Sequence, residues 1–476
     1  MKKILYLIPF VMLACNEPVA ESQLPNIVFI LADDMGYGDP SSYNPQGNIS
    51  TPHLDQLASE GMRFTDAHSP AAWCVPSRFG LLTGTYPFRN PRSYQDGLMS
   101  PQFPTVATIL KDVGYKTAMV GKWHQGIVDE KNPPPYTDLV NGPLDNGFDY
   151  FFGIPASLDI PPYYYIQNKR MLSRLTDSIA ASEGTAPAPG KRKIQGPFWR
   201  EGKMTPGFQH EEVLSKLFDE ADSYVRGGRQ DPFFLYLALP APHTPWLPDG
   251  DHQGRSEAGD YGDFVKQVDD HIGAFLTNLE RMGLKENTIV IFSSDNGPVW
   301  YPEDEKKYQH SATGPLAGMK GDALEGGHRM PFIVRWPGKV EAGSTQDGLI
   351  CFTDLLASCA ELTGQSLAAG VGQDSKSFVP LLLNPQSPSA RESLITQTTG
   401  KVYAIRVGDW KLIPTKGSGG FWDGYDPEYA ASNPFEGRLY NLKDDLSETQ
   451  NLYGEMPDKV SSLKNTLLKE MAVGKE

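Results

Sequence analysis

Cys74 lies in the stretch AAWCVPSRFGLLTG, residues 71–84, where its neighbours favour chemistry over packing. Free cysteines are often buried core residues, so simple packing is the ordinary alternative. Pro76 and Ser77 are typical of the first turn of a helix, and the residues after them can continue one. Free N–H groups at a helix start favour negative charge, and Arg78 adds a fixed cation. The stretch therefore predicts a nucleophile beside an anion-binding site.

The chain has only four cysteines in 476 residues. Cys351 and Cys359 lie in CFTDLLASCAELTG, residues 351–364, which is predicted as one helix. Eight helical positions span about 12 Å, too far for a disulfide, so we expect both to be core thiols. No cysteine pair has the spacing of a zinc site. A structural role for Cys74 is therefore disfavoured.

Residues 1–14, MKKILYLIPFVMLA, combine a basic start with a short apolar run and predict a secretory signal peptide. The end of this run resembles a bacterial lipobox, in which Cys15 is lipidated and becomes the new N-terminus. Ordinary cleavage near Val19 and Ala20 is the alternative. No later stretch is apolar enough for a transmembrane helix. We expect an exported bacterial protein, located in the periplasm or held by lipid at the outer membrane or cell surface.

Polar side chains follow four predicted strands at the point where each strand ends. The strands are Asn26–Ala32, Lys116–Val120, Phe233–Leu239 and Thr288–Ser293, and the residues that follow them are Asp33, Asp34, Lys122, His124, His243, Asp295 and Asn296. Taken singly, these residues could be turns, caps or packed side chains. Ligands bind beyond the carboxyl ends of parallel strands, so we expect them to meet at one edge. Three carboxylates and an amide suit Ca²⁺, or Mg²⁺, and no histidine cluster indicates zinc.

A glycine-rich segment, GPLAGMKGDALEGGHRMPFIVRWPG at residues 314–338, carries a further cation. Lys320 lies where the glycines allow a loop to approach a ligand closely. Glu325 and Arg329 could order this loop by pairing. Loop lysines are usually solvated, so this signal is weak by itself.

The elements that must position these residues alternate along the chain. Besides the four strands, we predict helices from residue 50 to Glu60 and over Thr105–Val113, Glu211–Arg226 and Tyr261–Met282. Strands that are apolar on both faces and alternate with helices predict an α/β fold with a mainly parallel central sheet flanked by helices. We place the catalytic domain at residues 24–385. Residues 125–210 lack periodicity and are expected to form long, substrate-facing surface loops.

Residues 386–476 show a different pattern. VYAIRVGDWKLIP and GRLYNLKDD are typical of antiparallel strands, and Pro457–Met471 is typical of a final helix. We therefore expect a small C-terminal α+β subdomain with an antiparallel sheet.

The formal net charge is −15, and no stretch forms a basic stripe. Nucleic acid is therefore excluded as an expected partner. An anionic substrate would need a local cationic pocket to oppose the overall field. Aromatic residues make up 11% of the chain, which suits either core packing or sugar stacking.

The chain resembles the type I sulfatases, the formylglycine-dependent branch of the alkaline phosphatase superfamily. The resemblance rests on CVPSR at 74–78 with LLTG at 81–84, and on GKWH at 121–124, SSDNG at 293–297 and EGG at 325–327. It extends from Pro25 to about residue 363. It implies an alkaline phosphatase-like fold and hydrolysis of sulfate esters.

The resemblance also implies a role for each site residue. Cys74 would be oxidised to formylglycine by a formylglycine-generating enzyme or an anaerobic sulfatase-maturing enzyme, and its hydrated aldehyde would attack sulfur. One Ca²⁺ would be bound by Asp33, Asp34, Asp295 and Asn296, with residue 74 facing it. Arg78 would help activate the nucleophile, Lys122 and Lys320 would hold the sulfate, His243 would protonate the leaving alcohol, and His124 would act as the base that releases sulfate.

Two other functions remain open from the sequence: a phosphomonoester or phosphodiester hydrolase of the same superfamily, and a lipoprotein that binds sulfated glycans without cleaving them. For a sulfatase, the expected substrate is a sulfated polysaccharide or its oligosaccharides. Motif-adjacent residues that could line the sugar site are Trp246, Trp300, His310, Arg89 and Arg92. The sulfate position, endo or exo action and the oligomeric state are not determined.

Overall fold

The structure is a computed structural model that describes residues 24–92, 97–127, 136–189, 191–227 and 231–473. The predicted signal peptide and Cys15 lie outside these residues. Within them, no helix is both long and apolar enough to cross a membrane.

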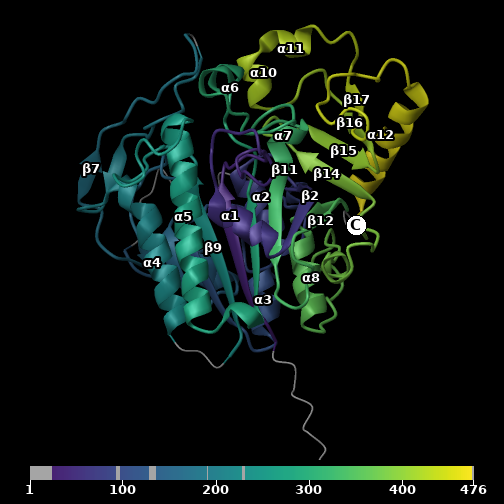
Figure 1. Ribbon diagram of the computed structural model, residues 1–476. Helices are drawn as coiled ribbons and strands as arrows, with labels where there is room; N and C mark the ends of the chain where they lie inside the picture. The colour runs from purple at the N-terminus through teal and green to yellow at the C-terminus, as the bar shows by residue number, and fades with distance from the viewer. Residues whose placement is uncertain (1–23, 93–96, 128–135, 190, 228–230, 474–476) are drawn as a thin grey trace, which may run out of the picture.

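A large sheet forms the centre of the molecule (Figure 1). Its strands are β1 (Asn26–Asp33), β2 (Met62–His68), β3 (Lys116–Lys122), β4 (Tyr150–Ile154), β5 (Ile166–Gln167), β6 (Arg170–Met171), β9 (Phe233–Pro242), β10 (Thr288–Ser294), β11 (Arg329–Arg335), β12 (Ser344–Gln346) and β13 (Ile350–Cys351). They run in the order β12-β2-β11-β10-β1-β9-β3-β4-β5-β6, with β13 beside β2. The five strands from β10 to β4 are mutually parallel, whereas β11 is antiparallel to both its neighbours. The predicted fold class is confirmed.

Strand β1 shows why the sheet is covered on both sides. All eight of its residues are buried. Ile27, Phe29 and Leu31 point into one hydrophobic core, and the alternate residues of the strand point into the other. Successive side chains of a strand face opposite ways, so an uninterrupted apolar strand needs helices on both faces.

The helices supply these two layers. They are α1 (Pro52–Ser59), α2 (Cys74–Thr83), α3 (Val106–Lys111), α4 (Val213–Arg226), α5 (Gly259–Arg281), α6 (Pro302–Tyr308), α7 (Glu325–His328), α8 (Asp354–Leu362) and α9 (Val379–Leu383). The apolar faces of α1, α4 and α5 contribute to one core, and those of α2, α3 and α8 to the other. The helices predicted for α1, α3, α4 and α5 are confirmed, with ends that differ by a few residues.

Two sequence expectations need correction, and two strands were missed. Cys351 and Cys359 do not share a helix, since Cys351 lies in β13 and α8 begins only at Asp354, although both are buried free thiols as expected. Residues 125–210 are not all loop, because β4 within them is parallel to β3. The strands β2 and β11 were not predicted from the sequence.

The C-terminal region has its own four-stranded antiparallel sheet, as predicted (Figure 1). It contains β14 (Ser393–Gln397), β15 (Tyr403–Val407), β16 (Trp410–Ile413) and β17 (Arg438–Asn441), joined by α10 (Phe421–Tyr425) and α11 (Pro427–Ala431). The final helix α12 (Pro457–Ala472) buries Val460, Leu463 and Leu467 in the core of this sheet. A further small hairpin, β7 (Asp177–Ile179) and β8 (Gly202–Met204), lies in the long connection before α4.

Candidate active site

The carboxyl ends of four neighbouring parallel strands bring the predicted polar residues together. Asp33 ends β1 and Lys122 ends β3, while His243 follows β9 and Asp295 follows β10. These strands are adjacent in the sheet, so their ends lie at one edge.

Alternating charges hold the centre of this site. Lys122 Nζ lies 2.6 Å from Asp33 Oδ2, and Lys320 Nζ lies 2.6 Å from Asp34 Oδ1. Arg78 donates from Nε to Asp295 Oδ2 over 2.8 Å. All of these side chains are buried. The glycine-rich loop therefore does deliver Lys320 to the strand ends.

The backbone is strained at two of the site residues. Asp34 has φ +62° and His124 has φ +52°, a left-handed conformation that residues other than glycine seldom adopt. Local contacts hold the turn at Asp34: its N–H donates to Asp295 Oδ1, and the Tyr261 hydroxyl donates to its carbonyl oxygen over 3.3 Å. Strain of this kind is typical of functional sites.

Cys74 is the first residue of helix α2, as its neighbours predicted. It is only 6% exposed, yet it lines the pocket described below. Burial raises the pKa of its thiol, although the charges of Lys122 and Lys320 oppose this. A thiol that stays protonated is a poor nucleophile, so this position does not favour thiolate chemistry.

The carboxylates fit a bound cation. Asp33 Oδ1 and Asn296 Oδ1 are buried without a hydrogen-bond partner among the described residues. Asn296 donates from Nδ2 to Asp34 Oδ1 over 2.6 Å, which leaves its own oxygen available as a ligand. Burial and the neighbouring Asp33 carboxylate raise the pKa of Asp295 to about 6. Unpaired oxygens and a destabilised carboxylate are what a divalent metal would satisfy.

Two histidines flank this cluster. His243 contacts the Thr244 carbonyl oxygen through Nδ1 over 2.6 Å, so Nδ1 carries the hydrogen. Its Nε2 then faces the site, 3.6 Å from Asp34 Oδ2. Burial, reinforced by Lys122 and Arg78, holds the pKa of His124 well below its usual range. The His124 ring is therefore neutral near pH 7.

One pocket of about 200 Å³ opens onto Cys74. Its predicted lining residues are Asp34, Cys74, His124, His243, Trp246 and Lys320, and those not predicted include Ser157, Asp159, Arg192, Phe198, Arg200 and Phe421. A larger cavity, of about 780 Å³, lies at the amino ends of the strands and contains none of the predicted site residues.

Four residues proposed for the sugar site lie elsewhere. Trp300 and His310 are buried behind the pocket, where His310 Nε2 donates to Asp39 Oδ1 over 2.9 Å. Arg89 is paired with Asp374, and Arg92 donates to the Met99 carbonyl oxygen. Each of these four side chains is bound to another residue of the chain, so they contribute to the structure of the protein and do not line the pocket.

Some of the unpredicted pocket residues lie in a sequence pattern that could have indicated them, and others do not. Phe198 and Arg200 belong to the run PFWR at 197–200, whose mixture of aromatic and basic residues in a loop-rich segment was a usable signal. Phe421 comes from the C-terminal region, and only tertiary contact places it at this pocket.

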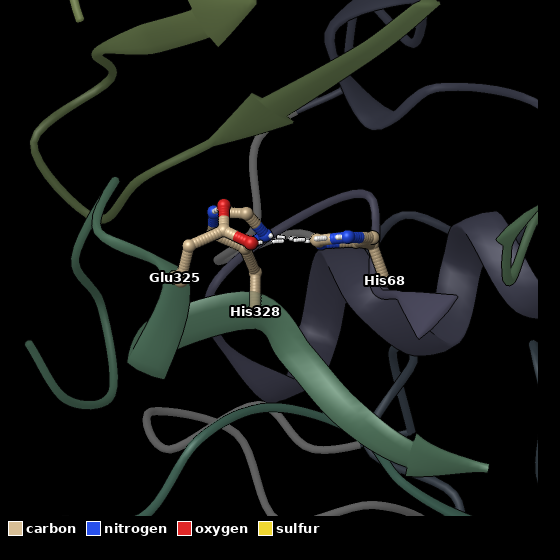
Figure 2. A group of neighbouring side chains, drawn as sticks. All are labelled: His68, Glu325 and His328. Atoms are coloured by element: carbon tan, nitrogen blue, oxygen red, sulfur yellow. Dashed lines mark hydrogen bonds and ion pairs between the residues drawn. The ribbon is translucent and has the colours of Figure 1, made fainter. Parts of the chain in front are cut away.

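A second group of metal-ligating side chains, His68, Glu325 and His328, lies between β2, α7 and the C-terminal sheet (Figure 2). The two rings contact each other through their Nδ1 atoms over 3.0 Å. The Nζ atom of Lys411, in β16, lies 2.8 Å from Glu325 Oε1 and 3.2 Å from His328 Nε2. The Lys411 ammonium also lies 2.9 Å from Glu448 and balances charge within the group, which is a buried charge network.

Comparison with known proteins identifies the family of the chain. The sulfatase family model matches residues 25–365. An N-acetylgalactosamine-6-O-sulfatase of Bacteroides thetaiotaomicron is 34% identical over 98% of both chains, and human arylsulfatase A is 34% identical over 96% of this chain and 90% of its own.

Solved structures give the same result. One from a study of the metabolism of multiple glycosaminoglycans by Bacteroides thetaiotaomicron has a TM-score of 0.83 and 32% identity, covering 94% of this chain and all of that one. A phosphonate monoester hydrolase of Agrobacterium radiobacter, 17% identical with a TM-score of 0.62 over 94% of this chain and 95% of its own, shares the fold alone. The chain belongs to the sulfatase family and is a sulfuric ester hydrolase.

Proposed function

We propose that the protein removes sulfate from sulfated glycans, with 6-sulfated N-acetylgalactosamine as the first candidate sugar. One observation carries this proposal: Cys74 lies in a single pocket with Lys320, His243 and Asp34. The relative that matches over nearly its full length is named for N-acetylgalactosamine 6-sulfate, and the similar solved structure comes from work on glycosaminoglycans.

Sulfatases generally depend on formylglycine and a divalent metal ion. At residue 74, the aldehyde of formylglycine would add one water and so supply two hydroxyl groups on one carbon, one to take up sulfate and one to release it. We propose Ca²⁺ as the metal, because Asp33, Asp34, Asp295 and Asn296 offer only oxygen ligands. Bound there, it would stabilise negative charge on the sulfate oxygens.

The chain's own residues then divide the work. Lys122, Lys320 and Arg78 hold the sulfate and the carboxylates in a fixed array, so the charge that develops meets oriented partners. With both ring nitrogens protonated, His243 delivers the proton on Nε2 to the departing alcohol oxygen and keeps the one on Nδ1. The neutral His124 takes up the proton at residue 74, and its Nδ1 has no hydrogen-bond partner among the described residues.

The N-terminal sequence supports a proposal for where in the cell the protein acts. We propose that the protein is exported by residues 1–14 and anchored through a lipidated Cys15, in the periplasm or at the cell surface. A formylglycine-generating enzyme or its anaerobic counterpart would convert Cys74 before or during export.

Both alternative functions are less well supported. The phosphonate monoester hydrolase that shares the fold is only 17% identical, whereas relatives of at least 30% identity over most of the chain are named as sulfatases. A glycan-binding protein would have no use for two histidines and Lys320 lining one pocket with Cys74.

The test is an activity panel on protein co-expressed with a maturing enzyme. N-acetylgalactosamine 6-sulfate should release sulfate, and 4-nitrophenyl phosphate should react far more slowly. The peptide containing residue 74 should be about 18 Da lighter than the cysteine form, because conversion replaces the thiol sulfur with an aldehyde oxygen and removes two hydrogens. Converted protein that released phosphate but no sulfate would overturn the proposal.

A further inference from the structure

An ion pair in the pocket wall is only partly satisfied. Arg200 donates from Nη1 to Asp159 Oδ2 over 2.9 Å, and its backbone N–H donates to the Asp159 carbonyl oxygen. Both residues line the pocket that contains Cys74. The Asp159 side chain is 8% exposed and that of Arg200 is 50% exposed. The buried carboxylate therefore fixes a guanidinium at the opening.

The other carboxylate oxygen of Asp159 has no hydrogen-bond partner among the described residues. It lies 4.0 Å from His243 Nδ1, which already donates to Thr244. Ser157, two residues earlier in the same pocket wall, also has a buried hydroxyl without a partner in the described chain. Burying polar atoms without partners costs free energy, so a ligand that supplies them is favoured.

A purely structural pair in this protein looks different. Arg406 contacts both oxygens of Asp66, from Nη1 to Oδ1 and from Nη2 to Oδ2, and His68 adds a third contact. Asp66 and Arg406 lie outside the pocket, whereas Asp159 and Arg200 lie in its wall beside His243. The incomplete pairing thus coincides with the substrate opening.

The chemistry of the pair selects a hydroxyl group. A hydroxyl both donates and accepts, and a carboxylate beside a guanidinium offers one acceptor and one donor. A second sulfate group would instead be repelled by the carboxylate. Asp159 Oδ1 lies beside the His243 ring, whose Nε2 faces the departing oxygen in the proposed function, so we place the hydroxyl on the sulfated sugar itself.

We propose that Asp159 and Arg200 together bind a free hydroxyl of the sugar next to the sulfate ester and so determine specificity. This inference rests on the proposed function. Asp159 accepts the hydrogen of that hydroxyl, and Arg200 donates to its oxygen. A 6-sulfated N-acetylgalactosamine has, apart from the anomeric position, free ring hydroxyls at carbons 3 and 4.

The test combines Asp159→Asn with substrate analogues that lack one hydroxyl. For the wild-type protein, kcat/KM on N-acetylgalactosamine 6-sulfate should exceed that on its 3-deoxy or its 4-deoxy analogue by about 10- to 100-fold. Asp159→Asn should lower kcat/KM on the parent sugar by a similar factor, yet leave the value on that same analogue within about threefold. Glu183→Gln is the matched control, because it breaks the exposed Lys193–Glu183 pair in the same segment. It should change kcat/KM neither on the parent sugar nor on the analogue.

If Asp159→Asn lowered kcat/KM by the same factor on the parent sugar and on both analogues, the inference would be overturned. Asp159 would then act only through the protein's own structure. Arg200→Ala provides a second variant and should show the same pattern. A wild-type protein with converted Cys74 that releases no sulfate from any sugar would instead refute the proposed function.

Discussion

The protein contains two buried clusters in which lysines pair with carboxylates. They differ in whether a pocket reaches them. At the strand ends, Lys122, Lys320 and Arg78 face three aspartates, and one buried oxygen each of Asp33 and Asn296 has no hydrogen-bond partner in the part of the chain that the structure describes. At the junction with the C-terminal sheet, beside the group in Figure 2, Lys411 is enclosed between Glu325, Glu448 and His328.

The difference lies in access. The first cluster borders the pocket at Cys74, whereas the residues of the second line none of the pockets described. Buried polar groups without partners cost free energy. A cluster that contains polar atoms without hydrogen-bond partners therefore needs a ligand to satisfy them. A cluster closed on itself stabilises one arrangement of the chain. The comparison therefore predicts that damage to the first affects turnover and damage to the second affects folding.

The largest expected effect is that of Cys74→Ala. This variant removes the precursor of the nucleophile, so sulfate release should fall by at least about 10⁴-fold. The midpoint of thermal unfolding should change little, because the side chain is small and no described hydrogen bond depends on it. Sulfate release and a thermal melt of the same preparation check both statements. Substantial activity in this variant would contradict a role for residue 74 in catalysis.

Lys411→Met tests the second cluster. It leaves the buried Glu325 and Glu448 without their shared cation, and breaking such a pair costs about 3–5 kcal/mol of the free energy of unfolding. Denaturant unfolding measures this loss. At temperatures well below the midpoint, kcat should stay within about tenfold of the wild-type value.

A double variant supplies the control for this prediction. Lys411→Met with Glu325→Gln should be more stable than Lys411→Met alone, because fewer uncompensated charges remain buried. If the single variant unfolded like the wild type, the cluster would not support the fold.

The smallest expected effect depends on pH. Burial, together with the Glu325 carboxylate, raises the pKa of Glu448 to about 7, although Lys411 opposes this. Glu325 keeps the negative charge, since Lys411 and Arg329 outweigh its burial and hold its pKa well below its usual range. A raised folded-state pKa gives stability that is present below about pH 4.5 and is lost as the pH rises through about 7.

Glu448→Gln imitates the protonated side chain at every pH. Relative to the wild type, it should therefore gain stability between pH 5 and pH 8, by less than about 3 kcal/mol. Unfolding curves of both proteins at these two pH values measure the change. A difference between them that does not vary with pH would show that Glu448 does not titrate in this range.

Much of the fold and the centre of the site could be predicted because they depend on local patterns. The apolar strand Asn26–Ala32 needs cover on both faces whatever surrounds it, and polar residues directly after such strands must lie at one edge. The start of α2 at Cys74 follows from Pro76 and Ser77 alone. Lys320 was a weaker signal, since its place depends on the path of a glycine-rich loop.

The pocket wall was decided by tertiary structure. Trp300, His310, Arg89 and Arg92 looked suitable for a sugar site, but each finds an internal partner that no local pattern reveals. Asp159 and Arg200 are 41 positions apart in the sequence, and Phe421 comes from beyond the central sheet altogether. The sequence by itself determined the chemistry at the strand ends, because strand direction sets those positions. Only the packing of distant segments decided which side chains face the substrate.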